Sequence, residues 1–191
     1  YLNGNLVTNL VIPDSVETIG GRAFYNCAYL TDIYLGDGVK NMSGRFEDCI
    51  SVENVHISSL ESWLDESKNL YLDIVDYNEV VTFNLCINGE KLTDIVIPDS
   101  VTKIRPNAFK NQAITSVSIH DKVTEIGDYA FGHSHGEGYG GVLNPALENI
   151  VIPDSVVTIG NGAFYGNHKL KSIRVSKNLE TIGGGAFSGC S

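Results

Sequence analysis

Ile150-Val151-Ile152-Pro153-Asp154-Ser155-Val156-Val157-Thr158-Ile159-Gly160-Asn161-Gly162-Ala163-Phe164 is the stretch that decides the fold. Nearly the same sequence occurs at residues 10–24 and 95–109, and weaker copies start at Ile33, Val117 and Ile173. Corresponding positions Val16, Val39, Val101, Val123, Val156 and Leu179 are separated by 23, 62, 22, 33 and 23 residues. The chain is therefore built from units of 22 or 23 residues, with one long interruption and one shorter insertion.

Each copy begins with a short segment in which apolar residues occupy alternate positions, such as Leu10 and Ile12. Because side chains of a β-strand alternate between its faces, each such pair lies on one face. A strand of three residues cannot bury that face by itself, whereas copies stacked about 4.8 Å apart in a parallel sheet bury all of them together. The repeat predicts a solenoid whose short parallel strands are ended by Pro13, Pro98 and Pro153.

Three further positions of the repeat predict structure. Glycine follows the second apolar pair, where we expect a backbone turn that a Cβ would strain, at Gly20, Gly127, Gly160 and Gly183. An aromatic residue closes each copy and predicts a stacked internal row, formed by Phe24, Phe46, Phe109, Phe131, Phe164 and Phe187. Three residues later we expect a small side chain to satisfy a backbone group of the turn, at Cys27, Cys49, Ser134, Asn167 and Cys190. Since Asn and Ser replace cysteine there, free thiols are favoured over two disulfides.

The pattern Ile-x-Ile-Pro-x-Ser-Val-x-x-Ile-Gly-x-x-Ala-Phe-x-x-Cys-x-x-Leu resembles the BspA-like (Treponema-type) leucine-rich repeat, over about residues 10–57 and 92–191. The resemblance implies a mainly β, right-handed leucine-rich-repeat solenoid with the Ile-x-Ile strands lining one face. It also implies a bacterial cell-surface or secreted protein that acts in adhesion or protein recognition. The family supplies no catalytic motif to transfer.

We expect one solenoid domain over residues 1–191, interrupted by a small helix-plus-hairpin island. Residues 1–9 are interpreted as the second arm of a truncated hairpin of a longer precursor, 10–57 and 92–191 as repeats, 58–91 as the island and 132–145 as an insertion. Within the island, residues 58–66 predict a short helix with a capping box between Ser58 and Glu61. Trp63 is expected against the sheet edge. Residues 70–75 and 79–87 predict strands, and Asn88-Gly89 predicts a hairpin turn.

Composition excludes several classes of partner. The 191 residues include 13 basic and 23 acidic side chains, for a net charge of −10. Nucleic acid and anionic membranes are bound by clustered Lys and Arg, so this balance argues against both. No apolar run approaches the length that spans a bilayer, and no membrane insertion by this segment is expected.

The strand residues that face away from the apolar pairs are the candidate recognition surface. Tyr34, His56 and Arg174 are of the aromatic, amphipathic and charged types that anchor protein interfaces. The predicted partner-binding residues on this outward face are Asp32, Tyr34, Asn54, His56, Ser118 and Arg174. A merely solvated sheet face is the alternative interpretation.

The sequence contains only weak matches to nucleotide-binding and metal-binding motifs. Residues 136–141 match G-x-G-x-x-G but lack the preceding strand and following helix of a dinucleotide site, which favours a loop. His133, His135 and Glu137 could ligate a divalent metal, although no fourth ligand is visible and a solvated turn is favoured. Neither a Gly-x-Ser-x-Gly elbow nor a His-Glu-x-x-His motif occurs. We predict no catalytic residues, no metal and no cofactor.

The sequence therefore favours a non-enzymatic, extracellular or cell-surface repeat protein that recognises or adheres to a protein of a host or a neighbouring cell. Two alternatives stay open. One is a structural spacer that displays other domains of a longer surface protein. The other is a carbohydrate- or metal-binding module that uses the island at 58–91 or the insertion at 132–145. The ligand and the oligomeric state do not follow from the sequence.

Overall fold

The computed structural model describes residues 6–42, 46–72, 74–76, 79–80, 82–133 and 147–190. Backbone contacts divide the chain into two compact units. Unit 1 comprises residues 1–63 and 67–91, and unit 2 comprises residues 64–66 and 92–191. The expectation of a single domain stays a prediction.

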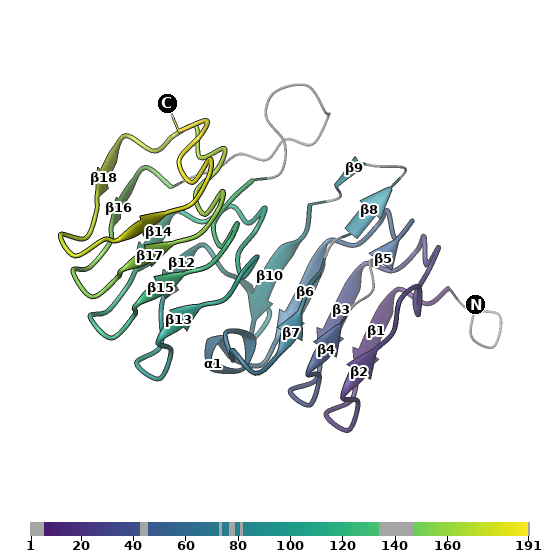
Figure 1. Ribbon diagram of the computed structural model, residues 1–191. Helices are drawn as coiled ribbons and strands as arrows, with labels where there is room; N and C mark the ends of the chain where they lie inside the picture. The colour runs from purple at the N-terminus through teal and green to yellow at the C-terminus, as the bar shows by residue number, and fades with distance from the viewer. Residues whose placement is uncertain are drawn as a thin grey trace. The chain divides into compact units, whose positions relative to one another are not determined.

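Unit 1 is a stack of short strands with one four-residue helix, α1 (Leu60–Trp63) (Figure 1). Its largest sheet has the order β1 (Asn9–Ile12), β3 (Asp32–Leu35), β6 (Asn54–Ile57), β10 (Asn84–Ile87), β11 (Glu90–Lys91). A second sheet contains β2 (Thr18–Ile19), β4 (Asn41–Met42) and β7 (Asn69–Leu70). A third contains β5 (Phe46–Glu47), β8 (Ile74–Asp76) and β9 (Glu79–Val80). All pairs are parallel except β8–β9 and β10–β11, which are hairpins.

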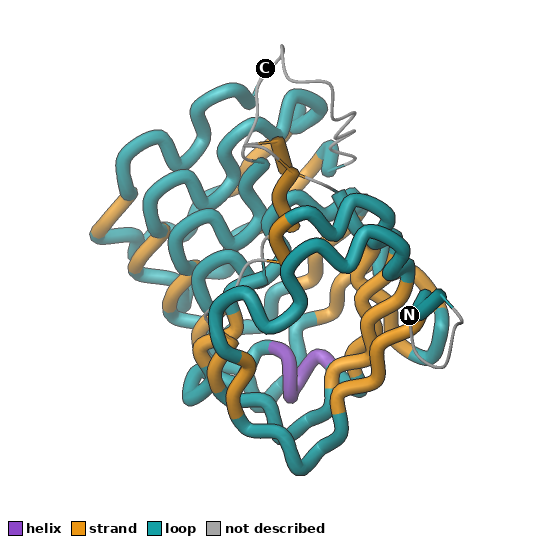
Figure 2. The backbone as a smooth tube through the Cα atoms, turned by 90° about the vertical axis from the view of Figure 1, so that its right-hand side faces the viewer, coloured by secondary structure: helices purple, strands orange, loops and turns teal. Residues whose placement is uncertain are grey.

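Unit 2 repeats the arrangement with parallel strands. β12 (Asp94–Val96) pairs with β14 (Ser116–Ser118), and β16 (Asn149–Val151) pairs with β18 (Ser172–Arg174). A four-stranded sheet has the order β13 (Lys103–Ile104), β15 (Glu125–Ile126), β17 (Thr158–Ile159), β19 (Thr181–Ile182). Figure 2 shows these strands in orange as short straight pieces between teal loops.

In the parallel sheets, equivalent positions of successive repeats are paired with one another. Leu10, Ile33 and Val55 are aligned across β1, β3 and β6, and both Ile33 and Val55 are fully buried. Ile150 and Ile173 are aligned in the same way across β16 and β18. The Ile-x-Ile pairs thus form the core side of the sheets except at Val175 in the last coil, which is 43% exposed. The predicted mainly β solenoid of short parallel strands is confirmed.

Phenylalanine rings stack in one interior row in each unit. The ring centroids of Phe24 and Phe46 lie 5.3 Å apart in unit 1. In unit 2, Phe131 stacks on Phe109 at 5.3 Å, and Phe164 stacks on Phe131 at 5.4 Å and on Phe187 at 5.3 Å. The planes of these rings deviate from parallel by at most 17°. The predicted internal row is confirmed.

Side chains three residues after the phenylalanine join neighbouring coils. The Cys49 thiol donates a hydrogen bond to the carbonyl of Phe24 at 3.0 Å, and the Cys190 thiol donates to that of Phe164 at 3.2 Å. Asn167 donates to the carbonyls of both Phe131 and Phe164 at 2.9 Å. Burial raises the pKa of the Cys49 thiol to about 11, so this donor keeps its proton. The four cysteines are free thiols, as the repeat predicted.

The expected role of the glycines after the second apolar pair is wrong in its physical cause. Gly127, Gly160 and Gly183 do not have positive φ angles. They are required because the preceding coil passes too close: a Cβ on Gly160 would lie 2.5 Å from the backbone nitrogen of Asp128. The left-handed residues stand two positions before and two after most of the phenylalanines, as at Arg22, Asn26, Asp48, Asn107, Asn111, Tyr129, Gly162, Gly166, Gly185 and Gly189.

The island folds onto the turn that follows β3. Helix α1 is shorter than predicted, and Ser59 rather than Ser58 caps it, accepting a hydrogen bond from the backbone N–H of Ser62 at 3.1 Å. Ser58 instead donates its hydroxyl proton to the carboxylate of Asp37. Trp63 is buried, at 5% exposure, and its predicted position against the sheet edge stays a prediction.

The strands of the island differ in extent from the prediction. The predicted strand at 70–75 is divided into β7 and β8, and the predicted strand at 79–87 into β9 and β10. Asn88 and Gly89 form the turn between β10 and β11 with φ angles of 53° and 80°. Two consecutive left-handed residues are typical of a type I′ hairpin turn, so the predicted turn is confirmed.

Candidate functional site

The outward face of the five-stranded sheet in unit 1 carries two rows of side chains. One row aligns Asn9, Asp32, Asn54 and Asn84, and the other aligns Val11, Tyr34, His56 and Cys86. Each row has one residue from each of the four parallel strands β1, β3, β6 and β10, because the parallel register places equivalent repeat positions side by side. Four of the six predicted partner-binding residues, Asp32, Tyr34, Asn54 and His56, are therefore neighbours.

Asp32 is the centre of a hydrogen-bonded group. Its Oδ1 accepts from His56 Nε2 and from Asn54 Nδ2, both at 3.0 Å, and its Oδ2 accepts from the Thr31 hydroxyl at 2.8 Å. The bond from His56 is the main cause that lowers the pKa of Asp32 below its ordinary value. An ionised carboxylate only accepts hydrogen bonds, so His56 carries its proton on Nε2.

Tyr34 and His56 are held face to face. Their ring centroids lie 4.2 Å apart with an interplanar angle of 5°. The His56 side chain is only 14% exposed, whereas Tyr34 is 40% exposed. His56 thus fixes Tyr34 from one side and Asp32 from the other, and the edge of Tyr34 remains available to a partner. On the next strand Val11 is 67% exposed and stands opposite Tyr34 in the register.

The sequence-based interpretation missed two members of this group on β10. Asn84 donates to Asn54 Oδ1 at 3.0 Å, and Cys86 stands opposite His56 in the register. We name the residues Asp32, Tyr34, Asn54, His56, Asn84 and Cys86 the Asp32 cluster. The pattern Asn84-Leu85-Cys86-Ile87 matches Asn54-Val55-His56-Ile57 and could have predicted this fourth strand. Its assignment as a hairpin arm concealed the parallel pairing with β6.

The other two predicted residues lie in unit 2 and have different surroundings. Ser118 stands opposite Val96 in the register, and Arg174 stands opposite Val151. Val96 and Val151 are 68% and 54% exposed. Arg174 forms an ion pair with Asp154 at 3.5 Å. Within unit 2, Ser118 and Arg174 are therefore each next to an exposed valine, and Arg174 is paired with an acid.

Unit 2 contains a simpler counterpart of the Asp32 group. Asp94 Oδ1 accepts from the hydroxyls of Ser116 at 2.5 Å and Thr115 at 3.0 Å, and Oδ2 accepts from Thr93 at 3.0 Å. These bonds, Ser116 first, lower the pKa of Asp94. The Thr-Asp pair at 93–94 thus repeats the pair at 31–32, but the aromatic and imidazole rings are replaced by Val96 and Ser118. The stacked rings of Tyr34 and His56 therefore distinguish the outward face of unit 1 from that of unit 2.

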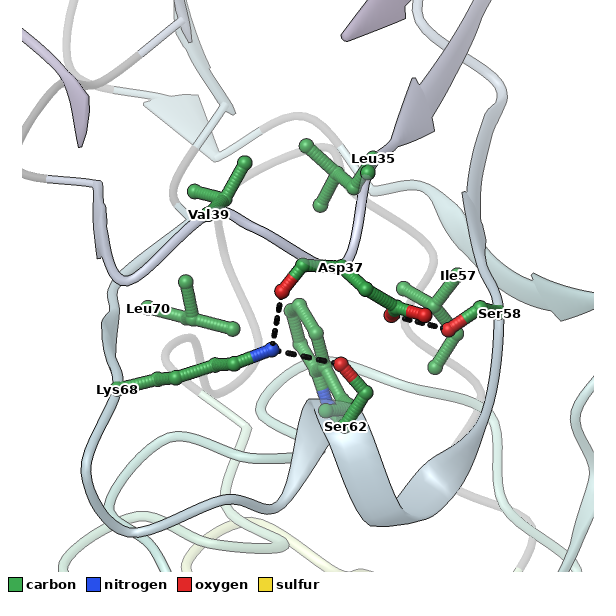
Figure 3. Close-up of a pocket in the computed structure, with 10 residues that line it drawn as sticks. Leu35, Asp37, Val39, Ile57, Ser58, Ser62, Lys68 and Leu70 are labelled. Carbon is green, nitrogen blue, oxygen red and sulfur yellow. Dashed lines mark hydrogen bonds between the residues drawn. The ribbon is translucent and has the colours of Figure 1, made fainter. Parts of the chain in front are cut away.

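A small cavity beside α1 is structural. Figure 3 shows Lys68 pointing into it between Val39, Leu70 and the helix. Its Nζ donates to the backbone oxygen of Asp37 at 2.8 Å and to the Ser62 hydroxyl at 2.6 Å. The Asp37 carboxylate accepts from Ser58, which is the main cause that lowers its pKa. The remaining volume of about 20 Å³ has room for one water molecule and for no larger ligand.

Residues considered for metal and nucleotide chemistry fall mostly outside the described part. His135, Glu137 and the glycine-rich segment 136–141 lie there. His133 is described and buried, at 3% exposure, and burial lowers its pKa to about 4. Among the described residues, no group of three or more His, Cys, Asp or Glu side chains could hold a metal ion. No described helix has the length and hydropathy to cross a bilayer.

The repeat geometry defines the class of protein: a solenoid of leucine-rich-repeat type, in which aligned short strands present variable outward residues. The family model for the BspA type leucine-rich repeat region matches residues 1–71, 73–137 and 143–191, with six copies. The chain belongs to this family. No curated protein matches the chain as a relative.

The solved structures that are similar to the chain include three leucine-rich repeat proteins. A leucine rich cell surface protein from Faecalibacterium prausnitzii A2-165 is 24% identical with a TM-score of 0.48, over 91% of this chain and 49% of that one. A leucine-rich repeat protein from Bacteroides ovatus is 19% identical with a TM-score of 0.45, over 96% of this chain and 58% of that one. A leucine-rich repeat protein from Eubacterium ventriosum is 15% identical with a TM-score of 0.33, over 97% of this chain and 83% of that one. The chain thus spans about half the length of the first two.

Proposed function

We propose that this chain is a non-enzymatic recognition segment of a cell-surface or secreted protein, and that it binds a protein of a host or neighbouring cell through the Asp32 cluster. Membership in the BspA-type repeat family supports a role in protein recognition. The observation that carries the assignment of the site is the fixed orientation of Tyr34 on the outward face. Residue types that anchor interfaces gain affinity when they are ordered before binding, because less conformational entropy is then lost.

The hydrogen-bonded residues around Tyr34 support the same proposal. Asp32 and Asn54 have partners within the sheet, so no cost of ordering them arises when a partner covers them. Val11 and the edge of Tyr34 supply exposed apolar surface next to these polar groups. An apolar centre with a polar rim is the usual composition of a protein–protein interface. The extracellular location is part of the proposal and follows from the resemblance to the family.

Binding to a panel of extracellular-matrix and epithelial surface proteins tests the proposal. The purified chain is immobilised and each protein is passed over it in an interferometer. For a protein that binds, Tyr34→Ala is expected to weaken the affinity about ten-fold or more, as for a central anchor of an interface. Tyr25→Ala is the matched control because Tyr25 is an exposed tyrosine of the same unit on a turn after Phe24, away from the sheet.

Three results would overturn the proposal in different ways. Binding that is weakened equally by Tyr25→Ala and Tyr34→Ala, or by neither, would refute the Asp32 cluster as the site. If Arg174→Ala alone weakened binding, the site would lie on unit 2. Absence of binding to every protein of the panel would favour the structural spacer.

A further inference from the structure

Cys27 and Cys49 occupy the same position in two adjacent coils of unit 1. Each stands three residues after a phenylalanine, and those phenylalanine rings, Phe24 and Phe46, stack at 5.3 Å. One residue before Cys27, the backbone N–H of Asn26 donates to the carbonyl of Glu47 at 2.9 Å. These two contacts, one to three residues before the cysteines, hold the two coils in register there.

The two cysteines are neighbours on adjacent coils. The Cys49 sulfur reaches the coil of Cys27, where it donates to the Phe24 carbonyl at 3.0 Å, and Cys27 is close enough to influence the pKa of the Cys49 thiol, although burial is the main cause that raises it. The stacked rings three residues before each cysteine are 5.3 Å apart, and a coil spacing of this size is within the range of Cα separations that a disulfide bridges. The arrangement is specific to this pair, since Cys190 has Asn167 at the equivalent position of the preceding coil and Cys86 stands opposite His56.

Small reagents can reach one of the two sulfurs. Cys27 is half-buried and lines a hollow of about 410 Å³ at the first described coil, whose other walls include Leu6, Leu10 and Tyr29. Cys49 is buried and does not line the hollow. A hollow of this volume admits a molecule far larger than water.

We propose that Cys27 and Cys49 form an oxidation site that takes a low-molecular-weight disulfide, such as oxidised glutathione, and closes to an intercoil disulfide. The Cys27 thiolate attacks one sulfur of the reagent, forming a mixed disulfide and releasing one thiolate. The Cys49 thiolate then attacks the Cys27 sulfur, and the second reagent thiolate leaves. The two protons of Cys27 and Cys49 end on the two released thiols. The cysteine pair loses two electrons and the reagent gains them.

Closure exchanges one weak interaction for a covalent link. The hydrogen bond from the Cys49 thiol to the Phe24 carbonyl is lost, because the sulfur loses its proton. The new bond joins two coils that are 22 residues apart in sequence, which restricts the unfolded chain. Burial of Cys49 keeps its thiol protonated at neutral pH, so the second step is expected to become faster as the pH rises.

Thiol counting on the intact chain tests the proposal. After incubation with oxidised glutathione at pH 8.5 and removal of the reagent, the unfolded wild-type chain is expected to expose two free thiols instead of four. Its mass falls by the two protons lost. The monomer band persists in non-reducing electrophoresis, and the thermal midpoint rises. Cys49→Asn, which copies the natural residue at Asn167, is expected to retain its three thiols or to hold one glutathione on Cys27 without closing.

Three outcomes would overturn the proposal. These are four free thiols in the treated wild type, a wild-type adduct of glutathione that never closes, and a bridge that peptide mapping assigns to Cys86 or Cys190. The variant Cys27→Ser guards against misfolding of Cys49→Asn, since a serine keeps a small polar side chain at this half-buried position. An equal loss of two thiols in Cys27→Ser would also contradict the assignment.

Discussion

The row of stacked phenylalanines gives a quantitative prediction for Phe164→Ala. Phe164 is fully buried, and it is stacked on both sides, by Phe131 at 5.4 Å and by Phe187 at 5.3 Å. Truncation of a buried phenylalanine costs about 3–5 kcal/mol of unfolding free energy. Each aromatic pair contributes about 0.5–1.5 kcal/mol beyond the buried area, so we expect a loss at the upper end of that range.

Phe187→Ala is the control in the same row. Phe187 is half-buried, and Phe164 is its one stacked neighbour among the described residues. Its truncation removes one ring contact instead of two and opens a smaller cavity, so the expected loss is about half as large. The comparison separates the effect of stacking from the general effect of losing a phenyl ring.

Urea unfolding followed by far-UV circular dichroism measures both variants. With a slope of about 2–3 kcal/mol per molar urea for a chain of this size, Phe164→Ala is expected to lower the midpoint by roughly 1–2 M. The slope must also be compared, because stacked coils can lose cooperativity when one interface is weakened. A loss below about 1 kcal/mol, or one equal to that of Phe187→Ala, would refute a continuous buried row as the stabilising element.

Three further predictions concern the coil contacts. Gly160→Ala is expected to cost about 1–3 kcal/mol of unfolding free energy, because the new Cβ would lie 2.5 Å from the backbone nitrogen of Asp128. Gly20→Ala is the control and should change the unfolding free energy little, because no atom lies within 4 Å of a Cβ at that position. Equal urea midpoints for the two variants would contradict close approach of the coils as the reason for Gly160. Asn167→Ala removes the side-chain donor to the Phe131 carbonyl, whereas the Phe164 carbonyl keeps the Cys190 thiol as a donor, and the change is expected to cost about 1–3 kcal/mol of unfolding free energy. Asn167→Cys should lose less, because Cys190 makes the equivalent bond between coils. If the Cys and Ala variants were equivalent in urea unfolding, the intercoil bond would not be the reason for Asn167. Burial lowers the pKa of His133 to about 4, so between about pH 4 and 6.5 the unfolded chain binds more protons than the folded chain. The free energy of unfolding should therefore fall as the pH falls through this range, by about 3 kcal/mol at most. His133→Gln should flatten this pH dependence in thermal melts, and an unchanged slope would exclude His133 as its source.

Part of the candidate site could be predicted from the repeat. Asp32, Tyr34, Asn54 and His56 follow from the alternation of strand side chains and from the 22-residue spacing, because equivalent positions of successive coils are neighbours. Asn84 and Cys86 did not follow, since β10 belongs to the island and its pairing partner β6 is 30 residues away. The four-residue match of 84–87 to 54–57 was not sufficient, because the 22-residue spacing that sets the register elsewhere is interrupted between them.

What the sequence by itself determined is the periodic part of this protein: the parallel coils, the buried Ile-x-Ile face, the row of phenylalanines and the hydrogen-bonding residues after them. Periodicity is sufficient there because each copy faces the same neighbours and must solve the same burial problem. The tertiary structure alone decided the contacts that depend on distances between coils. It showed that Gly160 is needed for close approach and not for a positive φ, and that Ser59 caps α1 because Asp37 engages Ser58. It also showed that His56 orients both Asp32 and Tyr34. Such contacts depend on which atoms meet in space, and the order of residues within one coil does not specify them.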